Sequence, residues 1–147
     1  MAERGSLRER PLGATAVVGQ SGFPRIASAT GGTLVIATGA SEPGFNPIDL
    51  LYASLSSCMV MSARIAAKRL GLLERIGALS VTVSGEKERD GEAERVALFT
   101  LVLSLEGDID REDAGRILHL AEEICTVSRT LQASASIRST VSVGSAG

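Results

Sequence analysis

The chain has 147 residues, of which 44% are hydrophobic and 22% are charged, the composition of an ordinary globular protein. Basic and acidic residues nearly balance, with a formal net charge of −2, so the charge predicts neither a nucleic-acid partner nor attraction to an anionic membrane. His119 is the one histidine, and Cys58 and Cys125 are the two cysteines. This set lacks the close ligand pairs of a zinc module, so we expect no metal site and no cofactor.

The sequence predicts no membrane association and no export. Residues 1–11 are mostly polar and do not have the order of a signal peptide. Residues 50–63 form the longest uncharged helical run, which is shorter than the roughly 17–25 residues that cross a bilayer. We therefore expect a cytoplasmic protein, whose thiols stay reduced unless they carry out redox chemistry.

The N-terminal third predicts an arm followed by strands. Residues 1–12 show no hydrophobic period, and we interpret them as a flexible or partner-docked arm before one domain over residues 13–147. Short β-prone runs follow at residues 14–18, 26–28 and 33–37, separated by glycine-rich segments. They predict two or three antiparallel strands, after which a segment rich in turn residues forms a loop.

Asn46 and Pro47 signal the start of a helix. Asn46 suits the N-cap, Pro47 the first helical position, and Asp49 the third position, where a carboxylate also favours the helix dipole. The helix is predicted to end before Gly71, which supplies a left-handed stop. Residues 50–63 are apolar or small on every helical face, so we expect this helix to be buried on all sides.

A hairpin and a second helix are predicted next. Residues 79–83 and 96–105 alternate or run apolar on either side of Asp90 and Gly91, which are typical of a tight hairpin turn. Asp110 then suits the N-cap of a second helix that reaches Cys125. Apolar residues recur along this helix at helical spacing, namely Ala114, Ile117, Leu118, Ala121 and Ile124.

The C-terminal segment predicts one more strand. Residues 126–132 are polar and continue as a turn or a further helical turn, and residues 135–143 alternate between apolar and polar side chains. The predicted order is βββ-α-ββ-α-β. The fold class is therefore α+β, with one long helix packed against antiparallel sheet.

Two short motifs around the cysteines resemble the signatures of one family. Asn46-Pro47 opens the predicted long helix and Cys58 follows about a dozen residues later, while residues 125–128, Cys-Thr-Val-Ser, follow the second helix. The pair of motifs in this order resembles the OsmC/Ohr family, that of osmotically inducible protein C and the organic hydroperoxide resistance proteins. The resemblance covers about residues 12–143 and lies nearer to a less characterised, OsmC-like branch.

The resemblance implies an enzyme, a peroxiredoxin-like thiol peroxidase that reduces organic hydroperoxides in the oxidative stress response. It also implies an OsmC-like fold as an intertwined homodimer, with active sites at the subunit interface. Cys58 matches the peroxidatic cysteine, which becomes a sulfenic acid, and Cys125 matches the resolving thiol, which condenses with it to a disulfide. A dithiol reductant, lipoyl or thioredoxin-like, would then reduce that disulfide.

The sequence departs from the family pattern at two places. Thr126 stands where the family usually has proline, and Ile48 stands where the hydroperoxide-resistance branch has a glutamate directly after Asn-Pro. The acid here, Asp49, comes one residue later. It precedes Cys58 by about 900° of helix rotation and roughly 13 Å of rise, so it lies on the opposite face. We interpret Asp49 as a capping carboxylate, with the alternative that it orients an arginine of the same or the partner subunit.

Arg25 is the candidate for that arginine. In the hydroperoxide-resistance branch an arginine from the early strand-loop region stabilises the thiolate, and Arg25 is the only basic residue between positions 11 and 63. The alternative is a solvated turn residue. His119 lies off the helix face of Cys125, and we expect it to be an ordinary surface or half-buried histidine. Arg129 would lower the pKa of Cys125 if the helix continues.

Two functions of other classes stay open beside the peroxidase. One is a non-enzymatic dimeric module that binds a small apolar ligand in its interface cavity, with Asp49 and Arg25 in structural roles. The other is a structural dimer whose cysteines are merely buried. The presence of both cysteines favours the peroxidase, and the missing glutamate after Asn-Pro favours the binding module.

Overall fold

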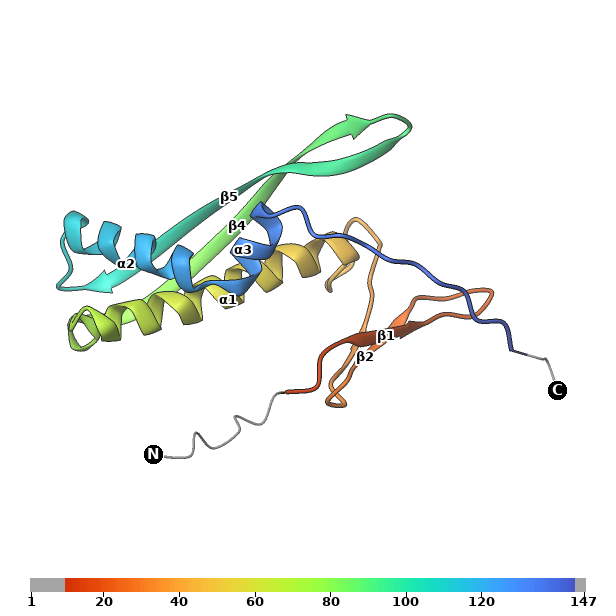
Figure 1. Cartoon of the computed structure of the whole chain (residues 1–147), viewed down its shortest axis with the longest axis horizontal. Coiled ribbons are helices and arrows are strands. Elements are labelled where there is room, and N and C mark those ends of the chain that lie inside the picture. The colour runs from red at the N-terminus through yellow and green to blue at the C-terminus, as the bar shows by residue number, and fades with distance from the viewer. Residues whose placement is uncertain (1–9, 145–147) are drawn as a thin grey trace, which may run out of the picture. The chain divides into compact units, whose positions relative to one another are not determined.

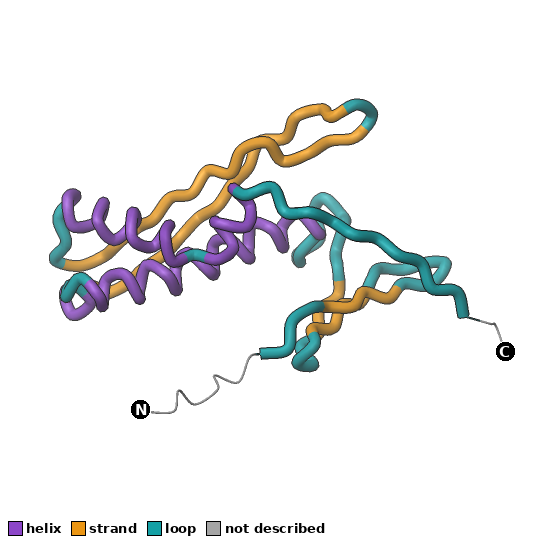
Figure 2. The backbone as a smooth tube through the Cα atoms, in the orientation of Figure 1, coloured by secondary structure: helices purple, strands orange, loops and turns teal. Residues whose placement is uncertain are grey.

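The computed structural model describes residues 10–144 (Figure 1). The chain divides into two compact units, and the boundary falls between Leu51 and Tyr52. Figure 2 shows that the first unit carries short strands and that the second combines helices with a long hairpin. Residues 1–9 of the predicted arm lie outside the described residues, and the assignment of residues 13–147 to a single domain stays a prediction.

The first unit contains a three-stranded antiparallel sheet in the order β1-β2-β3. β1 spans Ala14–Val17, β2 spans Arg25–Ser28 and β3 spans Thr33–Val35, which confirms the predicted strands. Ile26 lies opposite Leu34 in the register, and both side chains are half-buried. Successive residues point to opposite faces of a strand, so one face of this sheet is half-buried and the other is exposed.

The long helix α1 spans Pro47–Arg69 and has the predicted caps. The backbone N–H of Asp49 donates to the side-chain oxygen of Asn46 at 2.8 Å, and the N–H of Asn46 donates to the Asp49 carboxylate at 3.0 Å. This reciprocal pair is a capping box, which satisfies two free N–H groups of the first turn. At the other end Gly71 has a φ of +72°, and the N–H of Leu72 bonds back into the last turns.

α1 is buried on one face, which corrects the expectation of burial on all sides. Met61 is 51% exposed and Ile65 is 43% exposed. The buried face consists of Leu55, Met59, Ser62, Ala63, Ala66 and Ala67. Apolar composition does not specify which elements cover a helix, and the hairpin and α2 cover only one side of it. By length and composition alone α1 could cross a membrane, but its buried face forms the core of the second unit, as in a soluble protein.

The hairpin of the second unit is longer than predicted. β4 spans Ile76–Asp90 and β5 spans Ala93–Gly107, and they pair antiparallel (Figure 1). The turn consists of Gly91 and Glu92, one residue later than predicted, and Gly91 has a φ of +65°. Alternate residues of the hairpin pack against the helical core, namely Leu79, Val81, Val83, Phe99, Leu101, Leu103 and Leu105.

Gly85 gives an aromatic side chain room to lie against β4. A Cβ atom at this position would lie 2.5 Å from the hydroxyl oxygen of Tyr52. The Tyr52 ring also meets Phe99 edge-on, with the ring centroids 5.9 Å apart, and Phe99 is the cross-strand partner of Gly85. The missing side chain at residue 85 therefore seats Tyr52 of α1 against the hairpin.

Two helices follow the hairpin. α2 spans Arg111–Ile124, and Asp110 is its N-cap, with its side chain accepting from the N–H of Asp113 at 2.8 Å. This confirms the predicted helix start. α3 spans Thr126–Gln132, the segment predicted as a turn or a further helical turn.

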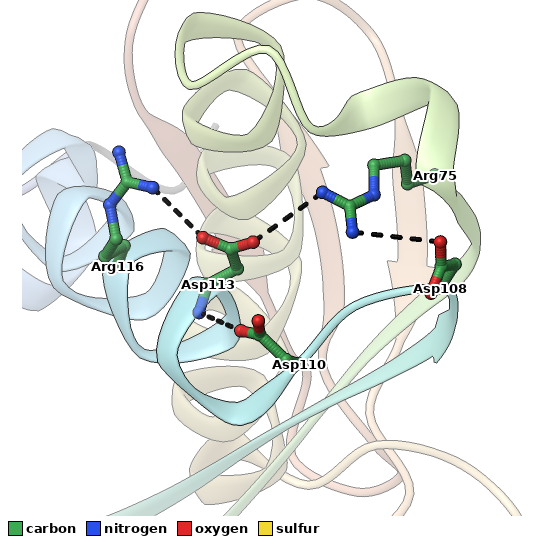
Figure 3. A network of polar contacts seen from close by, with 5 residues as sticks. All are labelled: Arg75, Asp108, Asp110, Asp113 and Arg116. Atoms are coloured by element: carbon green, nitrogen blue, oxygen red, sulfur yellow. Dashed lines mark hydrogen bonds and ion pairs between the residues drawn. The ribbon is translucent and has the colours of Figure 1, made fainter.

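A small polar network joins the start of α2 to the chain before β4 (Figure 3). Arg75, in the short helix η1 (Leu73–Arg75), lies 3.7 Å from Asp108 and 3.8 Å from Asp113, and Arg116 lies 3.0 Å from Asp113. The arginine of each pair is about half exposed to solvent, and such ion pairs each contribute about 1 kcal/mol or less. The backbones of Arg75 and Gly107 also lie close together here, because a Cβ atom at Gly107 would overlap the carbonyl oxygen of Arg75.

Residues 135–144 form no strand, which corrects the prediction of a last strand. Ile137, Val141 and Val143 are 92%, 90% and 89% exposed. Their alternation suits a strand with one buried face, but a strand needs a partner edge, and no residue in the described part of the chain pairs with this segment. The fold class is α+β as predicted, and the order in the described residues ends with two helices.

Candidate active site

Cys58 lies in the middle of α1, between its buried and exposed faces. Its side chain is partly buried and packs against the core cluster. Met61 and Ile65 follow it by three and seven residues, so they lie on the same side of the helix. The thiol therefore stands where the core of the second unit meets the exposed apolar side of α1.

Cys125 lies at the junction of α2 and α3. Its N–H still donates to the carbonyl of Ala121 and closes α2, while its φ of −68° and ψ of 107° turn the chain out of the helix. The side chain is fully buried. Its sulfur accepts a hydrogen bond from the N–H of Ser128 at 3.4 Å, so Cys125 is the N-cap of α3.

The fold brings the two cysteines into contact. Cys125 belongs to the same buried cluster that Cys58 packs against, and a side-chain hydrogen bond joins the two thiols. Both are free thiols in this structure. Packing of α2 and α3 against α1 thus joins residues that are far apart in the sequence. The sulfur pair is the chemical centre of the candidate site.

The surroundings of Cys58 favour its thiolate. Partial burial alone disfavours the charged form and raises the pKa, but four hydrogen-bond donors together outweigh it and lower the pKa of Cys58 below its ordinary value. The strongest donor is the backbone N–H of Val127, followed by the thiol of Cys125, the hydroxyl of Ser62 and the N–H of Thr126. A lowered pKa increases the fraction of reactive thiolate at neutral pH.

The surroundings of Cys125 have the opposite effect. Burial raises the pKa of Cys125 most, and the hydrogen bond and negative charge of Cys58 raise it further, against the lowering effect of the N–H groups of Ser128 and Val127. The surroundings therefore make Cys58 the more acidic of the two thiols.

Asp49 and Arg25 are the other two residues that the sequence predicted for the site. The Asp49 carboxylate caps the start of α1, as interpreted from the sequence, and precedes Cys58 by nine residues on that helix. Arg25 begins β2 in the first unit, on the exposed sheet face, opposite Val17 and Val35. Their participation in catalysis stays a prediction.

The sequence analysis did not predict three of the hydrogen-bond donors to Cys58. The N–H groups of Thr126 and Val127 become donors to Cys58 only through tertiary packing, so no local pattern could reveal them. Ser62 had a visible signal, since it follows Cys58 by one helical turn. His119 lies at the surface as expected, 79% exposed and 3.4 Å from Glu123. Among residues 10–144 no cluster of three or more metal-ligating side chains occurs.

A family model for the OsmC-like protein matches residues 39–140. The chain belongs to the OsmC-like protein family. An uncharacterized protein of Haloferax volcanii is 26% identical to this OsmC-like chain over 118 residues, which are 80% of this chain and 86% of that protein.

Solved structures of other members share the fold of this OsmC-like protein. An OsmC-like protein from Mycoplasma pneumoniae aligns with a TM-score of 0.73 and 16% identity, over 86% of this chain and 90% of that one. The organic hydroperoxide resistance protein OhrB of Bacillus subtilis aligns with a TM-score of 0.64 and 25% identity, over 83% of this chain and 90% of that one. The OsmC-like fold and the family predicted from the two cysteine motifs are confirmed.

Proposed function

We propose that this OsmC-like protein is a thiol-dependent peroxidase that reduces organic hydroperoxides, with Cys58 as the peroxidatic and Cys125 as the resolving cysteine. One observation carries the proposal: the two thiols are in contact, and their surroundings lower the pKa of one and raise that of the other. The similarity to a hydroperoxide resistance protein supports the substrate class.

In the first step the Cys58 thiolate attacks one oxygen of the hydroperoxide. A sulfur–oxygen bond forms, the O–O bond breaks, and the alkoxide leaves and takes a proton to become the alcohol. Cys58 is then a sulfenic acid, oxidised by two electrons. The apolar side of α1 around Met61 and Ile65 suits a substrate with an organic chain better than hydrogen peroxide.

In the second step Cys125 resolves the sulfenic acid. Its sulfur, having lost a proton, attacks the Cys58 sulfur, and a disulfide forms while the hydroxyl group leaves as water. Contact between the two thiols allows this step to precede a second oxidation of Cys58. A dithiol, lipoyl or thioredoxin-like, would then reduce the disulfide by thiol–disulfide exchange.

The active form proposed is a cytoplasmic homodimer. Its support is the apolar surface that the described chain leaves exposed, on α1 at Met61 and Ile65 and in the C-terminal segment at Val141. Within this proposal Arg25 stabilises the Cys58 thiolate, and Asp49 orients that arginine in the same or the partner subunit.

Mass spectrometry of the reduced protein after one equivalent of cumene hydroperoxide tests the proposal. We expect an intramolecular disulfide, seen as the loss of two hydrogens. Cys58→Ser should abolish peroxide consumption, whereas Cys125→Ser should allow one turnover and then accumulate sulfinic acid on Cys58. An unmodified wild-type chain would refute the peroxidase.

A wild-type chain that cumene hydroperoxide leaves unmodified would favour the second candidate function, a non-enzymatic module that binds a small apolar ligand. The observation in its favour is a cavity of about 360 Å³ in the second unit, with mostly apolar side chains around it, including Leu55, Met59, Phe99, Leu101 and Leu131. Retention of a fatty acyl probe by a chain inert to peroxide would support this module.

A further inference from the structure

Ser62 is a polar residue in an otherwise apolar stretch of α1. It is 4% exposed and belongs to the face that forms the core of the second unit. A buried hydroxyl costs free energy unless it makes a hydrogen bond. Ser62 follows Cys58 by four residues, so the two side chains are neighbours on the helix surface.

The serines of α1 differ in what their hydroxyls bond. Ser56 donates to the carbonyl of Ala53 at 3.1 Å, and Ser57 donates to the carbonyl of Ser54 at 3.2 Å. The Ser62 hydroxyl makes a side-chain hydrogen bond to Cys58, one helical turn earlier, and this bond helps to lower the pKa of that thiol. The hydrogen bond of Ser62 is thus made to the thiol, whereas those of Ser56 and Ser57 are made to their own helix.

We propose that Ser62 is a positioning residue of the site, whose hydroxyl holds the Cys58 sulfur in its charged form and in one orientation. A hydrogen bond to an ionised acceptor is about twice as strong as one between neutral groups, so the hydroxyl stabilises thiolate over thiol. This role of Ser62 rests on the proposed function, because only a reacting Cys58 needs a stable thiolate.

Ser62 differs from the other donors to Cys58 in where it is anchored. The N–H groups of Thr126 and Val127 and the thiol of Cys125 belong to the segment that joins α2 to α3. That segment must adjust when Cys125 forms a disulfide. Ser62 shares the rigid helix α1 with Cys58, so its hydrogen bond does not depend on the position of Cys125.

Ser62→Ala removes the hydroxyl with little change in volume, and Ser56→Ala is the matched control on the same helix. The rate of iodoacetamide alkylation of Cys58 is measured against pH in the reduced protein, with the site resolved by peptide mass spectrometry. Loss of a hydrogen bond to a charged group predicts alkylation about tenfold slower at pH 6.5 in Ser62→Ala, with the inflection at higher pH. Ser56→Ala should follow the wild type.

The variants Ser62→Thr and Ser62→Val separate the effect of the hydroxyl from the effect of packing. Both add bulk, but only threonine keeps the hydrogen-bond donor. We expect the threonine variant to alkylate faster than the valine variant, whatever stability both lose. A Ser62→Ala profile that overlaps the wild type, or equal rates in this pair, would overturn the inference. A wild-type Cys58 inert to cumene hydroperoxide would refute the proposed function alone, because alkylation needs no peroxide.

Discussion

The close approach of two backbone segments at Gly107 predicts that the small substitution Gly107→Ala is strongly destabilising. Gly107 has a φ of +135°, and an added Cβ would overlap the carbonyl oxygen of Arg75 and lie 3.1 Å from the N of Gly77. The strained φ costs about 1–3 kcal/mol for a residue with a side chain. The overlap forces a backbone shift worth about 1–3 kcal/mol more. We therefore expect the free energy of unfolding to fall by about 2–6 kcal/mol.

Two other glycines provide controls for the same substitution. Gly91 has a φ of +65° but open space around its Cα, so Gly91→Ala should cost only the left-handed strain of about 1–2 kcal/mol. Gly115 lies inside α2 with open space, and Gly115→Ala should stabilise the protein by about 0.5–1 kcal/mol. Urea unfolding at one fixed protein concentration measures all three. A cost for Gly107→Ala no larger than that for Gly91→Ala would refute the steric argument.

Three further predictions concern the site and the helix that carries it. The rate constant for peroxide consumption should fall as pH falls through the lowered pKa of Cys58 and should level off above that pKa, with the inflection at lower pH than for an ordinary thiol. Stopped-flow kinetics with an inflection at higher pH than for an ordinary thiol would contradict the hydrogen bonds assigned to Cys58. Asn46→Ala should lower the free energy of unfolding by about 1 kcal/mol through loss of the α1 cap, whereas Ser57→Ala should change it little, and equal losses would argue against the capping box. Gly85→Ala should destabilise through contact with Tyr52, and the cost should shrink in the Tyr52→Ala background of a double-mutant cycle; additive costs would contradict this contact.

Local signals in the sequence predicted the ends of the helices well. Asn46 and Asp49 at the start of α1, Gly71 at its end and Asp110 before α2 act within one or two helical turns. Their hydrogen bonds and dihedral angles depend on neighbours in the chain, so a short stretch of sequence is enough to specify them.

The predictions that failed concern which surfaces meet. The apolar run 50–63 predicted burial on all sides, but Met61 of that run is 51% exposed. The alternation over residues 135–143 predicted a strand, but Val141 is 90% exposed and unpaired within the described residues. A hydrophobic pattern predicts that a surface can be buried, but it does not predict which element packs against that surface.

Neighbouring residues in the chain specify where the helices begin and end, that the hairpin lies between them, and which two thiols the protein offers for chemistry. The contact of Cys58 with Cys125, and the donors Ser62, Thr126 and Val127 around one sulfur, arise only when the helices pack together. These two kinds of feature depend on interactions of different range. A cap or a turn is set by a few neighbouring dihedral angles, whereas the ionisation of a thiol is set by every donor, charge and apolar surface that folding brings within a few ångströms of it.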